Sequence, residues 1–385
     1  MKIIADENIP FAAECFSSLG DVTILSGRDI TSSAVRDADV LIVRSITKVD
    51  EKLLNGSSVK FVGTATIGFE HIDIEYLNQR NIGFASAPGS NANSVAEYVI
   101  AALLEIARKH RLSLEGRSIG IMGVGNVGSK VVQKCGALDM KLCLNDPPLQ
   151  RQTADKKYLP LEDLFGCDII TLHTPLTFEG IDKTYHLADE KFFKSLKSGC
   201  LFINTARGAV TDSAALKAAI KSGIVKTSVL DVWENEPDID IELLEMVDVA
   251  TPHIAGYSLD GKIAGMIMIY QAACKFFGLP VEKHIDDFLP KPDIPQLIIE
   301  NNLSDEQEIL RLTVKKIYDI TKDDAGLRRI LDLPRNKRPF IFDRLRKTYP
   351  VRREFQNTAC ILESKNKLGE KLKGIGFKVL KNGKQ

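Results

Sequence analysis

Short apolar runs alternate with longer segments of mixed polarity through residues 1–90 of the chain. The runs lie at Lys2–Ala5, Val22–Leu25, Val40–Val43, Phe61–Gly63 and Gly83–Ala85. Each run has the length of a strand, and the segments between the runs have the length of a helix. A strand that is buried on both faces of a parallel sheet reads as a continuous apolar run. The pattern therefore predicts an α/β lobe in which helices cover a parallel sheet.

A helical pattern at Asn93–His110, which Asn93 or Ser94 is expected to cap, leads into a second series of apolar runs. These strands are expected at Ile119–Met122, Leu142–Leu144, Asp168–His173, Leu201–Asn204, Ser228–Val232 and Val247–Ala250. Between and after them we expect a turn at Pro147-Pro148, short helices at Leu161–Phe165 and Ala214–Lys221, and a long helix at Ser258–Phe277. The chain thus predicts a second α/β lobe, with a cleft between the two lobes.

The region that follows the long helix has a different character. Residues 280–295 are rich in proline and acid, which is typical of a linker. Beyond them, helical periodicity at Asp305–Ile320 and strand-like runs at Ala359–Leu362 and Phe377–Leu380 predict a small α+β domain. We therefore expect three domains, formed by residues 1–92 with 258–285, by residues 93–257 and by residues 286–385.

Composition narrows the class of protein. The 385 residues carry 51 basic and 51 acidic side chains, so bulk charge indicates no polyanionic partner, although residues 286–385 hold 22 Lys and Arg against 15 Asp and Glu. The seven cysteines are dispersed without a C-x-x-C pair, which favours reduced thiols in a cytoplasm and no metal site. The N-terminus does not read as a signal peptide, and no apolar run approaches transmembrane length. We expect a cytoplasmic protein with no membrane partner.

The first strand of the second lobe ends in a G-x-G-x-x-G motif formed by Gly123, Gly125 and Gly128. A helix is expected at Val127–Ala137, followed by the strand at Leu142–Leu144. In such a unit the first glycine permits a tight turn, the second lets a pyrophosphate approach the backbone, and the third lets the helix pack close to the strand. The helix N-terminus then faces the phosphates. This context favours a dinucleotide site in a Rossmann-like lobe over a purely structural turn.

Asp146 follows the next strand, 18 residues after Gly128, which is close to the spacing of a ribose-binding acid. Its carboxylate would accept hydrogen bonds from the ribose diol of the adenosine. The same negative charge would repel a 2′-phosphate, so the sequence favours NAD over NADP as the cofactor.

Three residues of catalytic type follow successive strands of this lobe: Arg207, Glu236 and His253. Because parallel strands end at the same edge of a sheet, the three can converge where the nicotinamide ring would lie. Hydride transfer there requires a base for the alcohol proton, and a histidine suits that task. A carboxylate at Glu236 would orient the ring and favour the imidazolium, and the Arg207 guanidinium would hold a substrate carboxylate and polarise the reacting oxygen.

Each of these residues also has an ordinary interpretation as a loop, turn or helix-start residue, and their joint placement is what favours catalysis. His173 also ends a strand and is a rival acid or base. It has less weight because Thr174-Pro175 beside it is typical of a cofactor-binding loop. His71 and His110 are interpreted as structural.

The first lobe offers small polar groups after two of its strands. Ser45 and Thr66 are candidates to bind a substrate, because ligands of open α/β sheets lie beyond the carboxyl ends of strands. Arg44 is placed to face an anion. Ordinary turn chemistry and a surface salt bridge are the alternatives.

Together these motifs resemble the D-isomer-specific 2-hydroxyacid dehydrogenase family over roughly residues 1–285. The stretches that carry the resemblance are Gly123–Gly128 with Asp146, His173–Leu176, Asn204–Gly208, Asp231–Trp233 with Glu236-Pro237, and Thr251–Gly256. The resemblance implies NAD as the cofactor and the roles given above to the Arg, Glu and His side chains. It further implies a set of cofactor-binding residues: Asn126 and Val127 on the phosphates, Thr174 and Asp231 near the nicotinamide, and Gly256.

A narrower likeness, to members of that family that act on a phosphorylated hydroxy acid, spans nearly the whole chain. It rests on Lys2–Pro10, Arg44–Thr47, Asp146–Pro148, His253–Ser258 and Tyr349–Phe355. It implies that Ser45, Thr66 and Tyr257 contact the substrate. The three domains then become a substrate-binding lid (1–92 and 258–285), an NAD-binding domain (93–257) and a dimerisation domain (286–385) of a homodimer. Leu149 departs from the pattern, which has an arginine after the two prolines.

A substrate phosphate needs basic partners, and Arg44 is one candidate. The C-terminal domain offers Arg344, Arg346, Arg352 and Arg353, from the same chain or across a dimer. The alternative interpretation of these arginines is a solvated basic face.

Two rival functions stay open at this point. One is another D-2-hydroxyacid dehydrogenase, such as one that acts on 3-phosphoglycerate. The other is a non-enzymatic NAD-sensing regulator whose basic C-terminal region binds nucleic acid. The basic residues of that region are interleaved with acids and show no nucleic-acid-binding motif, so we expect no nucleic-acid partner.

Overall fold

The computed structural model describes residues 1–299, 305–363 and 367–381. The chain forms two compact units, Met1–Asn91 with Ser258–Lys291, and Ala92–Tyr257 with Pro292–Gln385. Two Rossmann-like parallel sheets and a small C-terminal sheet with helices confirm the predicted fold class. The cleft and the three-domain division stay predictions. No helix within the described residues combines the length and the apolarity needed to cross a membrane.

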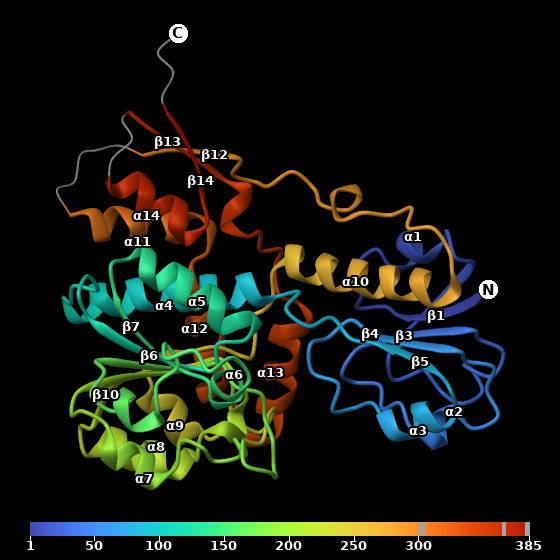
Figure 1. The fold of residues 1–385 in the computed structure, drawn as a ribbon, viewed down its shortest axis with the longest axis horizontal. Coiled ribbons are helices and arrows are strands. Elements are labelled where there is room, and N and C mark those ends of the chain that lie inside the picture. The colour runs from blue at the N-terminus through green and yellow to red at the C-terminus, as the bar shows by residue number, and fades with distance from the viewer. Residues whose placement is uncertain (300–304, 364–366, 382–385) are drawn as a thin grey trace. The chain divides into compact units, whose positions relative to one another are not determined.

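The first unit is a five-stranded parallel sheet in the order β2-β1-β3-β4-β5. Its strands are β1 (Lys2–Asp6), β2 (Asp21–Leu25), β3 (Val40–Val43), β4 (Phe61–Thr64) and β5 (Gly83–Ala85). Figure 1 shows α1 (Ala12–Phe16) and α10 (Leu259–Phe277) on one face, and α2 (Glu51–Leu54) and α3 (Ile74–Gln79) on the other. The apolar runs of β1, β3 and β4 are buried on both sides, in two separate cores, whereas the edge strand β2 is largely exposed.

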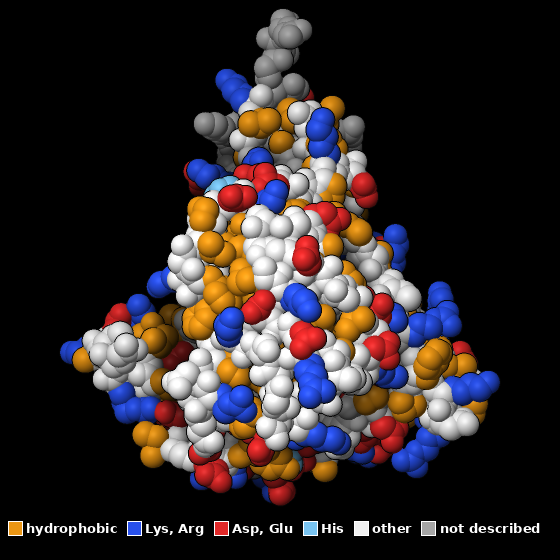
Figure 2. Space-filling model, turned by 90° about the vertical axis from the view of Figure 1, so that its right-hand side faces the viewer, with side chains coloured by type: hydrophobic (Ala, Val, Ile, Leu, Met, Phe, Trp, Pro, Cys, Tyr) orange, Lys and Arg blue, Asp and Glu red, His pale blue; other side chains and the backbone are white. Residues whose placement is uncertain are grey.

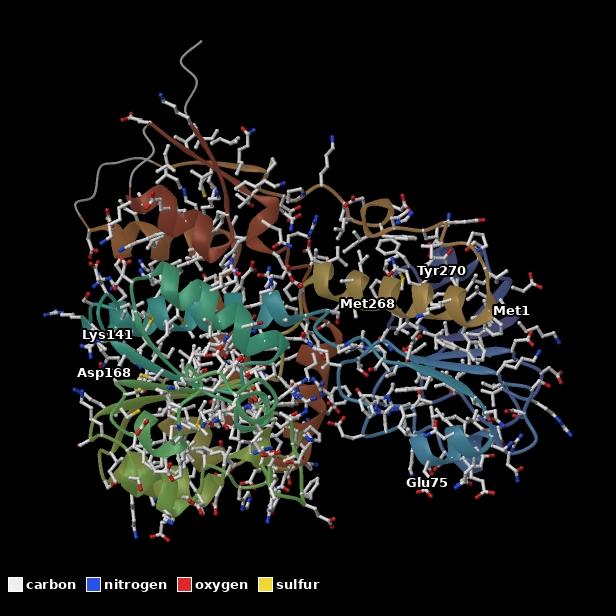
Figure 3. All side chains as sticks on the ribbon, in the orientation of Figure 1. Met1, Glu75, Lys141, Asp168, Met268 and Tyr270 are labelled. Atoms are coloured by element: carbon white, nitrogen blue, oxygen red, sulfur yellow. The ribbon has the colours of Figure 1, made fainter. Side chains whose placement is uncertain are left out.

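Helix α10 returns to the first unit from far along the chain. The Ser258 hydroxyl accepts a hydrogen bond from the Gly261 N–H and caps the helix, which ends at Gly278 in the left-handed region. Tyr270, labelled in Figure 3, is fully buried, and its hydroxyl lies 2.9 Å from the Ser18 hydroxyl. Gly63 in β4 allows the close approach of this helix, because a Cβ there would lie 2.2 Å from an Ile269 methyl group.

The second unit contains a six-stranded parallel sheet in the order β11-β10-β9-β8-β6-β7. Its strands are β6 (Ser118–Met122), β7 (Lys141–Asn145), β8 (Ile169–Leu172), β9 (Cys200–Asn204), β10 (Val225–Leu230) and β11 (Val249–Ala250). After β7 the chain crosses to the other side of β6, which makes β6 and β8 the topological switch point of the sheet. Ligands of open α/β sheets bind at such a point, beyond the carboxyl ends of the strands.

Helices cover both faces of this sheet. Figure 1 shows α4 (Ala92–His110) and α5 (Asn126–Ala137) on one face, and α7 (Glu190–Ser195), α8 (Ser213–Lys221) and α9 (Ile241–Met246) on the other. Asp168, labelled in Figure 3 just before β8, accepts hydrogen bonds from the Ser118 N–H and hydroxyl and from the Lys197 ammonium. These bonds fix the start of β6 beside β8.

The C-terminal region is a three-stranded parallel sheet with helices. Its elements are β12 (Gln296–Ile298), α11 (Glu306–Ile317), α12 (Ile320–Arg328), α13 (Arg338–Lys347), β13 (Ala359–Leu362), α14 (Lys367–Ile375) and β14 (Lys378–Lys381). Helices α11 and α14 share one hydrophobic core with α4 and α5. The Gln307 side chain accepts a hydrogen bond from the Leu114 N–H, and the buried Lys134 ammonium donates one to the Ile375 carbonyl. The region is therefore packed onto the second lobe.

Several sequence predictions about the local structure are wrong. Neither Asn93 nor Ser94 is the cap of α4, because the helix already begins at Ala92. The Asn93 amide instead donates hydrogen bonds to Glu97 and Glu354. The predicted turn at Pro147-Pro148 is the start of helix α6 (Pro147–Thr153), where proline fits because the first helical N–H groups have no partner inside the helix.

Two further boundaries differ from the predictions. The helix predicted at Asp305–Ile320 is two helices, because Tyr318 leaves the helical conformation and Asp319 caps α12. Strand β10 ends at Leu230, so Asp231 and Val232 lie in the following loop. The sequence pattern does not predict short helices such as α7 and α9, because six residues give too little periodicity to recognise.

Candidate active site

The glycine motif has the geometry that its sequence predicts. Gly123 has a φ of 84°, a conformation that other residues rarely adopt, and a Cβ there would lie 2.8 Å from the His173 carbonyl carbon and oxygen. A Cβ on Gly128 would lie 1.9 Å from the Gly123 carbonyl oxygen, so only glycine lets α5 pack this close. Around Gly125, by contrast, no described atom would lie within 4 Å of a Cβ. The turn is tight on its inner side and open where a pyrophosphate would approach.

Asp146 is held beside this turn by backbone groups. One carboxylate oxygen accepts a hydrogen bond of 2.7 Å from the Val124 N–H, and the other accepts one of 3.0 Å from the Leu149 N–H at the start of α6. Each oxygen keeps a lone pair for a ribose hydroxyl. The acid is thus fixed where the adenosine ribose is expected.

Leu149, which departs from the family pattern, lies in helix α6 and not in a turn.

Thr174 follows β8 on the other side of the switch point. Its hydroxyl oxygen is buried, and it has no hydrogen-bond partner among the described residues. Such atoms are uncommon in native proteins, and each needs an explanation. A bound cofactor amide would supply the missing partner. The open turn, the fixed acid and this hydroxyl together fit NAD, which would bring the hydride-accepting ring to this edge.

His253 and Glu236 are brought together, as the sequence predicts. The His253 Nδ1 atom lies 2.7 Å from the Glu236 Oε2 atom, and the other Glu236 oxygen accepts a hydrogen bond of 2.8 Å from the Trp233 N–H. Burial would raise the pKa of Glu236, but the neighbouring His253 ring, the Trp233 N–H and the Arg346 charge together lower it. The carboxylate is therefore ionised at neutral pH, and it can orient the ring and stabilise the imidazolium.

The loop that carries His253 is fixed by a buried acid. Asp231 is 1% exposed and accepts hydrogen bonds from the N–H groups of Ile254 and Ala255 and from the Thr251 hydroxyl, at 2.8, 2.9 and 2.6 Å. Its own carbonyl accepts a bond from the His253 N–H at 2.7 Å, while His253 has a φ of 57°. A strained backbone of this kind persists where its surroundings hold it. Sequence reasoning missed this positioning role. The predicted contact of Asp231 with the cofactor stays a prediction.

Arg207 follows β9, in a turn shaped by Asn204. The Asn204 amide donates to the Arg207 carbonyl at 3.0 Å and accepts from the Ala206 N–H at 2.9 Å. The neighbouring Gly208 touches the Glu236 loop, because a Cβ on it would lie 1.9 Å from the Trp233 carbonyl oxygen. The arginine turn and the Glu236 loop are therefore in direct backbone contact. Since β9, β10 and β11 are neighbours in the sheet, the loops that carry the three predicted residues gather at one edge.

The rival histidine is not available for acid–base chemistry. The two ring nitrogens of His173 lie 3.0 Å from the Thr171 hydroxyl and 3.2 Å from the Thr205 hydroxyl. Burial lowers the pKa of His173 to about 3, so the ring is neutral at physiological pH. His71 and His110 bond to Thr64 and Asp248, which agrees with the structural roles expected of them.

This buried histidine makes stability depend on pH. The pKa of His173 falls from its usual 6.5 to about 3 on folding, so between these values the unfolded chain binds a proton that the folded chain does not. We expect the contribution of His173 to the free energy of unfolding to be fully present above pH 6.5. It should be lost on acidification toward pH 3, by up to about 1.4 kcal/mol per pH unit. Urea titrations of the wild type and of His173→Gln would measure this. Equal pH slopes in the two proteins would show that the folded state protonates His173.

The candidate substrate residues of the first unit follow neighbouring strands. Thr66, after β4, donates a hydrogen bond to the Gly68 carbonyl at 2.8 Å, and its oxygen lies 2.7 Å from the Thr64 hydroxyl. Arg44, after β3, donates to the Asn8 carbonyl at 3.3 Å, and Ser45 beside it is exposed. Their roles in substrate binding stay predictions.

The four C-terminal arginines have different surroundings. Arg352 is 5% exposed, donates to the Ser94 and Ala255 carbonyls at 2.9 and 2.8 Å, and stacks on the Tyr318 ring. It holds the core together and is poorly placed to bind a substrate phosphate. Arg353 donates to the Asn357 side chain. Arg344 is exposed, whereas Arg346 hydrogen-bonds Tyr257 and interacts with the Glu236 charge.

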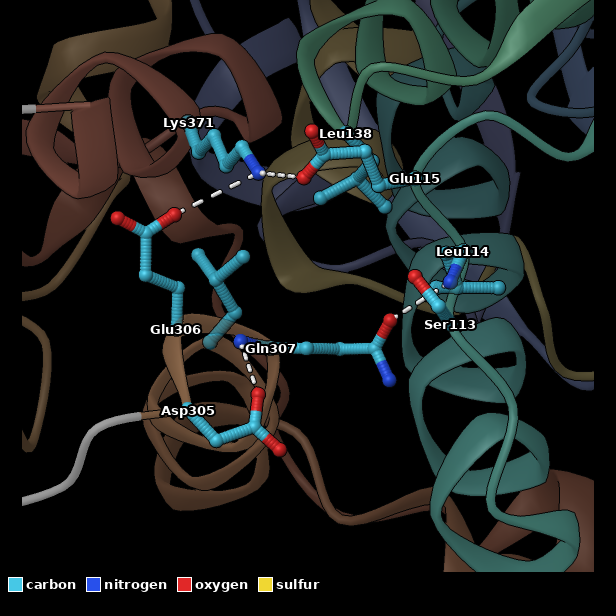
Figure 4. Close-up of a pocket in the computed structure, with 9 residues that line it drawn as sticks. Ser113, Leu114, Glu115, Leu138, Asp305, Glu306, Gln307 and Lys371 are labelled. Atoms are coloured by element: carbon cyan, nitrogen blue, oxygen red, sulfur yellow. Dashed lines mark hydrogen bonds and ion pairs between the residues drawn. The ribbon is translucent and has the colours of Figure 1, made fainter.

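A surface pocket of about 250 Å³ lies elsewhere in this unit, between the segment after α4 and helices α11 and α14 (Figure 4). Lys371 there forms ion pairs of 3.3 Å with Glu115 and 3.6 Å with Glu306. None of the predicted site residues lines this pocket.

The fold and this edge of the sheet define a class of protein. Residues 96–255 match the model of the D-isomer-specific 2-hydroxyacid dehydrogenase NAD-binding domain, and residues 288–376 match a domain of unknown function. An NAD⁺-bound 3-phosphoglycerate dehydrogenase of Entamoeba histolytica is 28% identical, with a TM-score of 0.62 over 75% of this chain and 99% of that one. A D-lactate dehydrogenase of Aquifex aeolicus, complexed with NAD and lactic acid, is 25% identical, with a TM-score of 0.59 over 72% and 95%.

Curated relatives narrow the class further. Proteins named erythronate-4-phosphate dehydrogenase from Escherichia coli O1:K1 and Shigella boydii serotype 4 are each 44% identical over 364 residues, which is 94% of this chain and 94% of theirs. This chain belongs to the erythronate-4-phosphate dehydrogenase family. Its residues 96–255 are an NAD-binding domain.

Proposed function

We propose that this chain oxidises 4-phospho-D-erythronate at C2 to (R)-3-hydroxy-2-oxo-4-phosphobutanoate, with NAD⁺ as hydride acceptor, in the biosynthesis of pyridoxal 5′-phosphate. The observation that carries the proposal is the 2.7 Å pair of His253 and Glu236 at the sheet edge next to the glycine turn. The 44% identity over nearly the full length of the named relatives supports this substrate. The solved structures noted above cover about three quarters of the chain, so their activities support it less.

Each residue of the trio has one task in this reaction. Arg207 binds the substrate carboxylate through paired hydrogen bonds and keeps C2 in place. His253 accepts the proton of the C2 hydroxyl as the C2 hydride leaves, and Glu236 stabilises the resulting imidazolium. In the reverse direction His253 returns the proton. Bound NAD supplies the electrophilic ring that takes the hydride.

The test is NADH formation by the purified chain with NAD⁺, offered 4-phospho-D-erythronate and 3-phospho-D-glycerate in parallel. Turnover on the first and weak turnover on the second is expected. Turnover on 3-phospho-D-glycerate alone would keep the mechanism and overturn the substrate. NAD binding without turnover on either compound would favour the regulator.

The ion pairs of the C-terminal region argue against nucleic-acid binding by such a regulator. Arg311 pairs with Glu105 and Glu308 at 2.9 and 2.7 Å, and Lys367 and Lys371 both pair with Glu115 and Asp139. On the face shown in Figure 2, basic and acidic side chains are interspersed. Such a surface lacks the one-sign field that phosphate backbones select.

We further propose that the chain is a cytoplasmic homodimer joined through residues 286–385. The edge strands β12 and β14 of the C-terminal sheet carry the exposed side chains Ile298 and Leu380. Exposed apolar edge strands commonly pair with another chain. All seven cysteines are free, as in a reducing compartment. Light scattering should give twice the chain mass of 42.6 kDa, and a mass of one chain would contradict the dimer.

A further inference from the structure

The proposed substrate has one charged group that the catalytic trio leaves unassigned. Arg207 takes the carboxylate, and His253 takes the hydroxyl proton. The phosphate at C4 needs a cation near Glu236 and His253 without disturbing their contact. Buried anions are paired or strongly hydrogen-bonded, so such a cation is required if the phosphate leaves water. This inference rests on the proposed function.

Arg346 lies in the last turn of α13 and reaches the catalytic loops from the C-terminal region. Its side chain hydrogen-bonds Tyr257 and interacts electrostatically with Glu236. Its Nε–H is buried and has no hydrogen-bond acceptor among the described residues. The Asp343 carboxylate lies 3.8 Å from Nη1, which is longer than a hydrogen bond. A charged guanidinium whose Nε–H has no acceptor among the described residues therefore lies beside the candidate active site.

The other C-terminal arginines do not combine these properties. Arg352 also has buried donors without an acceptor among the described residues, Nε and Nη1, but it lies in the core on the Tyr318 ring, and its Nη2 donates to the Ser94 and Ala255 carbonyls. Arg353 donates to Asn357, and Arg344 is exposed on α13. Arg346, in contrast, interacts with both the Tyr257 side chain and the Glu236 carboxylate.

We propose that Arg346 is a specificity-determining residue that binds the phosphate group of the substrate, together with the Tyr257 hydroxyl. Its planar guanidinium presents two parallel N–H donors to a phosphate, one of which is the buried Nε–H that now has no acceptor. Its positive charge also separates the phosphate from the Glu236 carboxylate, so Glu236 stays paired with His253. The C-terminal region would thereby select phosphorylated over unphosphorylated hydroxy acids.

The test compares Arg346→Gln with the wild type on 4-phospho-D-erythronate and on D-erythronate, with Arg344→Gln from the same helix as the matched control. For Arg346→Gln we expect kcat/KM on the phosphorylated substrate to fall about 10- to 100-fold, mainly through KM. On D-erythronate the variant and the wild type should agree within about threefold. Arg346→Lys should recover part of the lost kcat/KM, since lysine keeps the positive charge but lacks the two parallel N–H donors of the guanidinium. Arg344→Gln should match the wild type.

A second readout does not depend on turnover. In the presence of NADH, 4-phospho-D-erythronate should raise the unfolding temperature of the wild type and of Arg344→Gln by more than that of Arg346→Gln. An equal loss on both substrates would overturn the proposal, because Arg346 would then act through Glu236. Unchanged kinetics would overturn it as well. A wild type that oxidises 3-phospho-D-glycerate but not 4-phospho-D-erythronate would overturn the proposed function itself, and that result is distinguishable from both.

Discussion

Replacing His253 by alanine should lower kcat for the oxidation of 4-phospho-D-erythronate by about two to four orders of magnitude, the usual contribution of a positioned general base. The His253 Nδ1 atom lies 2.7 Å from the Glu236 carboxylate, which leaves the other ring nitrogen for the substrate hydroxyl. Without the imidazole, the hydroxyl proton must pass to water as the hydride leaves. Steady-state NADH formation measures the loss, and KM should change little because His253 acts on the transition state.

The loop that carries His253 also carries Gly256, a predicted cofactor-binding residue, so the control must exclude a folding defect. His110→Ala removes a histidine in the same unit that bonds Asp248 at 3.1 Å, outside the trio. It should keep nearly full activity. NAD binding, followed by fluorescence titration, should be the same in both variants. Retention of more than about a tenth of the kcat by His253→Ala would contradict the assignment of the base.

Arg207→Gln should lower kcat/KM by about two to three orders of magnitude, because it removes the paired donors that hold the carboxylate and polarise the oxygen at C2. Both KM and kcat should change, since the substrate is bound less tightly and positioned less well. Arg207→Lys should recover only part of the activity, because a point charge cannot make two parallel hydrogen bonds.

Arg151→Gln is a suitable control for Arg207. Arg151 is an exposed arginine of α6 that pairs with Asp182, and its loss should have little effect. Kinetics at saturating concentrations of alcohols without a carboxylate would show how much of the loss in Arg207→Gln comes from the carboxylate contact. If Arg207→Gln kept wild-type kinetics on 4-phospho-D-erythronate, the carboxylate would have to be bound elsewhere, and the trio would reduce to a pair.

The local geometry of the candidate site could be predicted largely because its signals are local. The glycine turn follows from three residues within six positions, and Gly123 and Gly128 have the φ and the close contact that the motif requires. Arg207, Glu236 and His253 each follow an apolar strand, and parallel topology then places their loops at one edge. The 2.7 Å pair of Glu236 and His253 confirms that two of these loops meet.

What the sequence could not show depends on contacts between distant segments. The positioning role of the buried Asp231 cannot be predicted without two tertiary facts. Strand β10 ends at Leu230, and the loop after β11 folds back onto Asp231. The contact of Gly208 with Trp233 has no local signature, since an Arg-Gly turn usually only starts a helix. The sequence alone does not distinguish a turn from a helix start at Pro147-Pro148, because proline suits both a turn and a first helical position.

The C-terminal region shows the same limit. Its strands at β13 and β14 were predicted to within one residue, because they are short apolar runs. The separation of Arg346 from Arg352 could not be predicted. Both are basic residues in a basic segment. Only tertiary packing places Arg346 beside Tyr257 and Glu236 and buries Arg352 in the core.

In the proposed reaction this chain moves the hydride from C2 of 4-phospho-D-erythronate to NAD⁺. The most direct test is to supply the substrate with deuterium at C2 and to analyse the reduced cofactor by mass spectrometry. We predict reduced cofactor that is heavier by one mass unit and a slower rate when the chemical step is observed in a single turnover. Unlabelled NADH from the deuterated substrate would show that another carbon is oxidised and would contradict hydride transfer from C2.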